Sequence, residues 1–169
     1  IIRKSRAARR RNFHWKPSLP DTGKFSRRYW IEMTSSRISV IICTRNRFDD
    51  FRMTLYSLML QSSLPDELVV VDSSDINELE PYLKSAGLPV PVKYVHSKPG
   101  LTLQRNVGIR NSKGDLVFFF DDDCELEVNY LAKVEAVFEQ DAQGRIGAVG
   151  GRLENLFGNQ PMTLKFRME

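Results

Sequence analysis

Residues 116–123 read Leu116-Val117-Phe118-Phe119-Phe120-Asp121-Asp122-Asp123, five apolar residues followed directly by three carboxylates. The apolar run is rich in β-forming residues and predicts a strand that is buried on both faces. Three adjacent like charges repel one another, and a divalent cation or the hydroxyl groups of a ligand would relieve that repulsion. Ligands bind at the carboxyl ends of the strands in open α/β sheets. The stretch therefore predicts a metal-assisted or polyhydroxyl-binding site at one edge of a sheet.

Apolar runs alternate with helix-like segments from residue 38 onward. The apolar runs predict strands at Ile38–Cys43, Glu67–Asp72, Val92–His96, Leu116–Phe120 and Ile146–Gly150. Helices are expected over 51–59 after a cap at Asp49 or Asp50, after a capping box of Asp75 and Glu78, over 101–111 and over 129–138. This alternation is typical of parallel strands joined by right-handed crossovers. We therefore predict an α/β fold, a doubly wound, mostly parallel sheet with helices on both faces.

Length and composition restrict the class of protein. A chain of 169 residues that is 41% hydrophobic and 27% charged suits one globular domain with a sizeable core. No apolar stretch is long enough to cross a bilayer, and nothing resembles a signal peptide. The two cysteines, Cys43 and Cys124, form no disulfide framework, so we expect a reducing, cytoplasmic location.

Charge is distributed unevenly along the chain. The net charge is +4, but residues 1–30 hold ten Lys or Arg and a single acid, Asp21. Residues 1–36 show no sustained period and are predicted to be a basic, loosely ordered extension. Such an extension is most simply a solvated tail or linker. The alternative is an arm that binds the anionic, cytoplasmic face of a membrane, and we do not expect a nucleic-acid partner. The domain would then occupy residues 37–169, truncated at the C-terminus.

Polar side chains follow two further strands. The first strand is followed by Thr44-Arg45-Asn46-Arg47, which suits the phosphates of a nucleotide, although a solvated turn would have the same composition. The second strand ends in Asp72, whose carboxylate can accept hydrogen bonds from a ribose or a base. In the helix over 101–111, Arg105 can reach a phosphate or a base, and Gly108 predicts close packing. Neither the G-x-G-x-x-G fingerprint nor the P-loop is present.

Taken in order, these motifs resemble the nucleotide-binding half of a family 2 glycosyltransferase with the GT-A fold. The stretches that carry the resemblance are Ile38–Arg47, Val69–Ser74, Gln104–Ile109 and Phe118–Asp123, and Gly147–Gly151 is similar to the strand that follows in the family. The resemblance covers roughly residues 37–152.

The resemblance implies a nucleotide-sugar donor, here expected to be a UDP-sugar, and a glycan, lipid or protein acceptor. Thr44, Arg45, Asn46, Arg47, Asp72, Arg105, Asp121 and Asp122 would bind the nucleotide-sugar. Within that set Asp72 would contact the base, Arg105 the base or the diphosphate, and Asp121 the ribose. Asp121-Asp122-Asp123 matches the family's DxD motif, so Asp123 would coordinate Mn²⁺ or Mg²⁺ on the diphosphate.

The chemistry of such an enzyme also needs a base for the acceptor hydroxyl. In inverting members of the family the base is a carboxylate further along the chain. Glu154 comes too early to match it, so the base is expected beyond Glu169. Two alternatives stay open at this point, a nucleotidyltransferase on a related sheet and a non-catalytic nucleotide- or metal-binding module. The stretch 44–47 lacks the glycine-rich loop of the first and the acids that a response-regulator-like module would carry.

Overall fold

The computed structural model describes residues 1–3 and 36–151. Four parallel strands form the sheet, and their bounds are β2 (Ile38–Thr44), β3 (Glu67–Asp72), β4 (Val92–His96) and β5 (Leu116–Phe120). A short strand, β1 (Ile2–Arg3), pairs antiparallel with β5, so the strand order is β1-β5-β2-β3-β4. The predicted mostly parallel sheet is confirmed. In the part of the chain described, no helix is long and apolar enough to cross a membrane.

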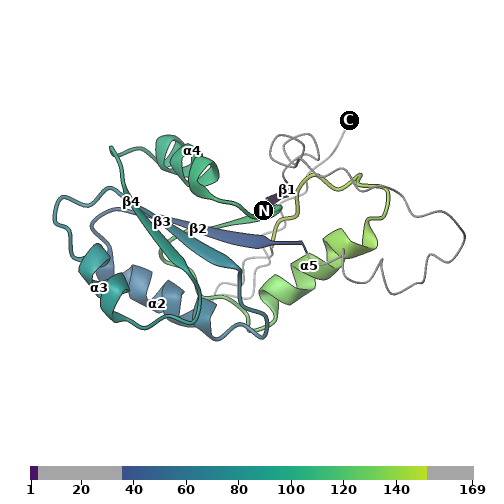
Figure 1. Cartoon of the computed structure of the whole chain (residues 1–169), viewed down its shortest axis with the longest axis horizontal. Helices are drawn as coiled ribbons and strands as arrows, with labels where there is room; N and C mark the ends of the chain where they lie inside the picture. The colour runs from purple at the N-terminus through teal and green to yellow at the C-terminus, as the bar shows by residue number, and fades with distance from the viewer. Residues whose placement is uncertain (4–35, 152–169) are drawn as a thin grey trace, which may run out of the picture.

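Helices cover both faces of the sheet (Figure 1). One face carries α2 (Phe48–Met59), α3 (Leu79–Ser85) and α5 (Tyr130–Gln140), and the other carries α4 (Leu101–Asn111). Successive side chains of a strand point to opposite faces, so β2 sends Val40 and Ile42 into the larger core and Ile41 toward α4. The doubly wound arrangement predicted from the sequence is therefore confirmed.

Helix α4 lies unusually close to the sheet at Gly108. A Cβ atom placed on this glycine would lie 2.5 Å from Cγ2 of Ile41, which confirms the close packing predicted there. The approach also brings the buried Gln104 over the ends of two strands. Its Nε2 donates hydrogen bonds to the carbonyl oxygens of Thr44 and Val71, each at 3.0 Å. Helix α4 therefore holds the carboxyl ends of β2 and β3 together.

The predicted helix caps are wrong in two places. Helix α2 begins before Asp49, so Asp49 and Asp50 lie in its first turn. Their negative charges interact favourably with the helix dipole there, but neither side chain caps the helix. Asp75 does not cap α3, because its carboxylate and its backbone N–H both pair with Asn46 across the strand ends. The side chain of Asn77 accepts a hydrogen bond from the first turn of α3 instead.

The predicted fifth strand, Ile146–Gly150, is also wrong. Only Ala148 of this stretch forms an isolated bridge, since two glycines weaken the stretch as a strand and β1 already occupies the free edge of β5. The stretch runs beside the chain start, where the N–H of Val149 donates to the carbonyl of Ile1 at 3.4 Å. Strand β1 lies inside the extension that was predicted to be loosely ordered, and the rest of that extension, residues 4–35, lies outside the described residues.

Candidate functional site

Three loops meet at the carboxyl edge of the sheet. Strand β2 lies between β3 and β5, and the register places Thr44 opposite Asp72 and Ile42 opposite Phe120. The loops that follow these strands therefore leave the sheet side by side. Thr44 and the acidic triplet, 78 residues apart in the chain, are joined directly by a 2.6 Å hydrogen bond from Oγ1 of Thr44 to Oδ2 of Asp122. The predicted convergence of these loops at one edge is confirmed.

The acidic triplet, Asp121–Asp123, presents its carboxylates in two directions. The side chain of Asp122 is 9% exposed, whereas those of Asp121 and Asp123 are 67% and 54% exposed. Asp122 is therefore the least accessible of the three, and its carboxylate is already held by Thr44 and Arg47. The outer two carboxylates are the ones that a ligand can reach.

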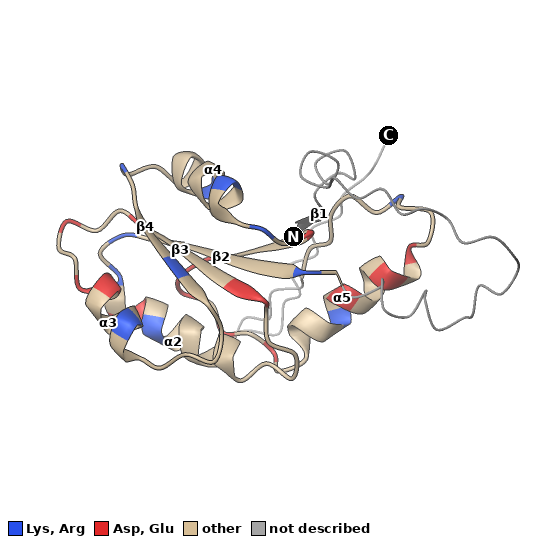
Figure 2. Cartoon of the chain, viewed as in Figure 1, with Lys and Arg blue, Asp and Glu red and all other residues tan. Residues whose placement is uncertain are grey.

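Two arginines relieve the repulsion within the triplet. Nη1 of Arg47 lies 3.3 Å from Oδ1 of Asp122 and 2.9 Å from Oδ2 of Asp123. Nη2 of Arg105 lies 3.1 Å from Oδ1 of Asp121. Helix α4, which supplies Arg105, carries basic residues and no acidic residue (Figure 2). The chain thus supplies two positive charges for three carboxylates. Arg47 and Arg105 therefore relieve much of the repulsion for which the sequence predicted an external cation.

Helix α2 holds the loop that follows the triplet. Oγ1 of Thr54 donates to the carbonyl of Cys124 at 2.8 Å and accepts from the N–H of the same residue at 3.0 Å. Ser57 accepts from the N–H of Leu126 at 3.1 Å, and Gln61 accepts from the first turns of α5. These three polar side chains are buried. The expected helix rested on apolar residues alone and so did not include these three, of which Thr54 and Ser57 lie on α2 and Gln61 lies just after it. Their three- and four-residue spacing was a usable signal.

Asp72 lies fully buried at the end of β3. Its Oδ1 accepts hydrogen bonds from the N–H (2.8 Å) and the hydroxyl (2.6 Å) of Ser74, and its Oδ2 accepts one from the hydroxyl of Tyr94 at 3.0 Å. Burial, with the hydrogen bond to Asp72, raises the pKa of Tyr94, so this hydroxyl remains a donor. The sequence did not indicate Tyr94 as a site residue, because β4 comes beside Asp72 only through the order of the strands in the folded sheet.

The side chains of the loop after β2 turn toward the two strands that flank β2, which are β3 and β5. Asn46 adopts the left-handed conformation (φ 55°), which asparagine tolerates better than most residues. Its side chain exchanges two hydrogen bonds with Asp75, at 2.8 and 2.9 Å, and Arg45 lies 3.6 Å from the same carboxylate. Arg45 and Asn46 therefore turn toward β3, and Arg47 turns toward β5. All the predicted site residues lie at one edge, but in two groups.

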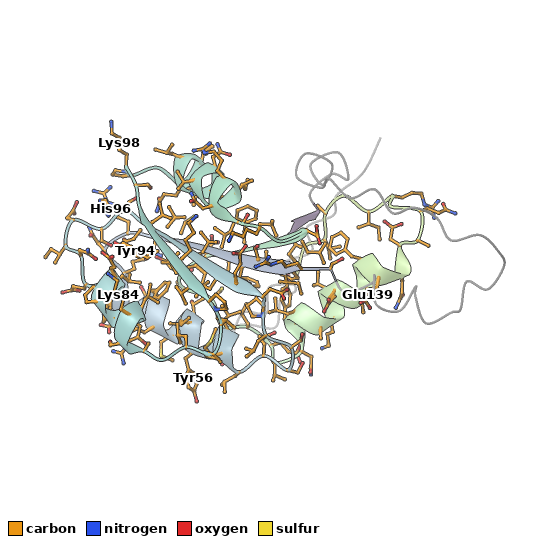
Figure 3. The ribbon with its side chains drawn as sticks, viewed as in Figure 1. Tyr56, Lys84, Tyr94, His96, Lys98 and Glu139 are labelled. Carbon is orange, nitrogen blue, oxygen red and sulfur yellow. The ribbon has the colours of Figure 1, made fainter. Side chains whose placement is uncertain are left out.

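Two cavities flank the loop after β3. The larger, about 490 Å³, lies at the ends of β3 and β4 and is lined by Ser73, Ser74, Asp75, His96, Ser97, Lys98 and Pro99. The smaller, about 300 Å³, is lined by Asn46, Phe48, Ser74, Asp75, Ile76, Glu78 and Leu79. Figure 3 shows His96 and Lys98 following Tyr94 toward this end of β4. The sequence did not single out His96 as a site residue, although the strand-end rule that singled out Asp72 applies to β4 as well.

The remaining side chains to consider at this edge are the two cysteines and the residues that could bind a metal ion. Burial raises the pKa of the Cys43 and Cys124 thiols to about 11, so both are protonated near neutral pH. Within residues 1–3 and 36–151, no group of three or more His, Cys, Asp and Glu side chains is placed to hold a metal ion by itself. Glu154, the one carboxylate considered as a base, lies outside the described residues.

Comparison with curated proteins finds glycosyltransferases. An uncharacterised glycosyltransferase of Haemophilus influenzae is 35% identical over 103 residues, which are 61% of this chain and 35% of the relative. One of Rickettsia bellii is 24% identical over 132 residues, 73% of this chain and 19% of the relative. Polypeptide N-acetylgalactosaminyltransferase 13 of Rattus norvegicus is 28% identical over 134 residues, 73% of this chain and 24% of the relative. The chain thus spans about a third or less of the length of these relatives.

Solved structures and a family model agree with these relatives. TarS 1–349 of Staphylococcus aureus in complex with UDP superposes with a TM-score of 0.54 at 26% identity, over 62% of this chain and 32% of TarS. Its complex with UDP-GlcNAc gives a TM-score of 0.53 at 27% identity, over 62% of this chain and 31% of TarS. The sequence model described as glycosyl transferase family 2 matches residues 39–168, well over half of the chain. The chain belongs to glycosyl transferase family 2.

Proposed function

We propose that this domain binds a UDP-sugar with a divalent cation and takes part in moving the sugar to an acceptor hydroxyl. The observation that carries the proposal is the meeting of two exposed carboxylates, Asp121 and Asp123, with two arginines, Arg47 and Arg105, at the carboxyl edge of the sheet. Membership of the family supports sugar transfer, and the UDP and UDP-GlcNAc complexes of TarS support a uridine nucleotide donor.

The diphosphate would be bound by the arginines of this edge. Guanidinium groups bind phosphate oxygens through paired, charge-assisted hydrogen bonds. The side chains of Arg47 and Arg105 are 52% and 42% exposed, and each reaches the triplet, so a diphosphate placed there meets one cation from the loop after β2 and one from helix α4. Arg45, on the β3 side of the same loop, would add a third positive charge.

A divalent cation fits the donor set at this edge. Mg²⁺ is commonly held by one or two carboxylates together with the phosphates of a substrate, and Mn²⁺ accepts the same hard oxygen ligands. The exposed carboxylates of Asp121 and Asp123 match that requirement, and the lack of a three-residue ligand group among the described residues is compatible with it. Asp123 would hold the cation. When bound, the cation would act as a Lewis acid that stabilises negative charge on the departing diphosphate.

The nucleobase would lie beside the loop after β3. The cavity of about 490 Å³ there falls within the range of about 300–1,000 Å³ that is common for small-molecule sites. Asp72 is fully buried directly before the cavity-lining Ser73, and both of its carboxylate oxygens are engaged, so we propose that it contacts the base in exchange for one of its present bonds to Ser74 or Tyr94. Thr44 and Asp122 would hold the two loops in register.

The remaining parts of the reaction are proposed from the family alone. We propose an inverting reaction whose base lies beyond Glu169 and an acceptor that is a glycan, a lipid or a protein. We also propose a cytoplasmic location, which rests on the cysteine content of the chain and not on the family. The basic extension could place the domain at a membrane surface.

Calorimetric titration with UDP, in the presence and absence of MnCl₂, tests the proposal. We expect Mn²⁺ to tighten UDP binding on the order of tenfold in the wild-type chain. Asp123→Ala should abolish this dependence, because the replaced carboxylate is the proposed metal ligand. Glu139→Ala, which removes an exposed carboxylate from α5 (Figure 3), is the matched control and should behave as the wild type. A folded wild-type chain that binds no UDP would refute the proposal.

A further inference from the structure

We propose that Arg47 is an exchangeable counter-ion of the acidic triplet. Without donor its guanidinium occupies the place of the divalent cation, and with donor it pairs with the diphosphate. The inference rests on the proposed function and deepens it, because it names how the metal and the nucleotide depend on each other at the same site.

The geometry places one nitrogen of Arg47 between two carboxylates. Nη1 lies 2.9 Å from Oδ2 of Asp123 and 3.3 Å from Oδ1 of Asp122. Asp122 cannot turn away from this contact without cost, because it is buried and its other oxygen accepts the 2.6 Å bond from Thr44. A positive charge therefore lies between the carboxylates of Asp122 and Asp123, where a cation held by Asp123 would be attracted.

Arg47 is also held loosely enough to leave. Its side chain is 52% exposed and it directly precedes α2, outside the helix itself. Ion pairs between exposed side chains are weak, because water screens the charges and ordering the side chains costs entropy. A divalent cation carries twice the charge of a guanidinium, so it can replace Arg47 at the carboxylates when a new partner for the arginine is available.

The exchange predicts coupling between metal and nucleotide. A metal ion that binds without a diphosphate must displace the guanidinium of Arg47 from the carboxylates. The positive charge of Arg47 then remains close to the metal ion and weakens its binding. A metal ion that arrives with a diphosphate provides the displaced guanidinium with phosphate oxygens to bind. Each ligand should therefore tighten the binding of the other by the same factor, as linkage requires.

Calorimetry on the full chain tests this exchange with three probes: MnCl₂ alone, UDP alone, and UDP in the presence of MnCl₂. Arg47→Gln removes the internal cation, so it should bind Mn²⁺ alone on the order of fivefold more tightly than the wild type. It should bind UDP with Mn²⁺ less tightly, so the coupling factor falls. Arg52→Gln is the matched control: Arg52 has the same 52% exposure and a 3.5 Å ion pair with Asp49, away from the triplet, and should change neither affinity.

Further variants make the outcome independent of any one substitution. Arg47→Lys retains the charge and should bind Mn²⁺ alone as weakly as the wild type, whereas Arg47→Met should resemble Arg47→Gln and replaces it if the glutamine variant does not fold. Affinities of Arg47→Gln and Arg47→Met for Mn²⁺ that equal or fall below the wild-type value would overturn the exchange while leaving the proposed function intact. A wild-type chain that binds neither Mn²⁺ nor UDP would overturn both.

Discussion

Replacing Thr54 with valine removes its two hydrogen bonds to Cys124, through which helix α2 holds the start of the loop after the acidic triplet. Thr54 is fully buried, and its hydroxyl both donates to the carbonyl and accepts from the N–H of Cys124, at 2.8 and 3.0 Å. Valine has nearly the same shape but no hydroxyl, so two partly buried backbone groups lose their partner. At about 1 kcal/mol for each group, Thr54→Val should lower the free energy of unfolding by about 2 kcal/mol.

Thr54→Ser separates the hydrogen bonds from the packing. Serine keeps the hydroxyl and loses one buried methyl group, which costs about 1 kcal/mol. In urea unfolding followed by circular dichroism, with a slope of about 2 kcal/mol/M, the midpoint should fall by about 1 M for valine and about 0.5 M for serine.

The same substitution should reach the proposed metal site, because Cys124 directly follows Asp123. Mn²⁺-dependent UDP binding should weaken in Thr54→Val and persist in Thr54→Ser. A valine variant that is as stable as the serine variant, or more stable, would show that the Thr54 hydroxyl contributes nothing to holding this loop.

Two further predictions concern packing and titration. Gly108→Ala gains about 1 kcal/mol of helix propensity, but its Cβ would lie 2.5 Å from Cγ2 of the buried Ile41, and overpacking of this kind costs about 1–3 kcal/mol. The melting temperature should therefore fall, and an unchanged or higher value would contradict the close contact. Burial raises the pKa of Cys43 and Cys124 to about 11, so alkylation by iodoacetamide, followed by mass spectrometry, should be slow at pH 8 and accelerate above pH 10. Rapid alkylation of both cysteines in the folded chain at pH 8 would contradict the conclusion that burial raises the pKa of these thiols.

The sequence alone determined most of the elements and the edge at which the site lies. Long apolar runs that stop at Asp72 and at Asp121 marked both the strands and their carboxyl ends, and parallel strands bring such ends together whatever side chains follow. The apolar pattern of the sequence predicted strands less well in segments that are short or contain glycine. Two glycines weaken Ile146–Gly150 as a strand, and the edge of β5 is taken by Ile2–Arg3, which no periodicity could have indicated.

Tertiary structure alone decided how the side chains of the site are paired. Arg47 meets Asp123, Arg105 meets Asp121, and Tyr94 meets Asp72 only because of the strand order β5-β2-β3-β4 and the close approach of α4. Apolar periodicity reports which face of an element is buried, and it does so over a few neighbouring residues. A charge pair instead depends on two atoms lying within about 3–4 Å across the fold, a distance that exists only after the chain has packed.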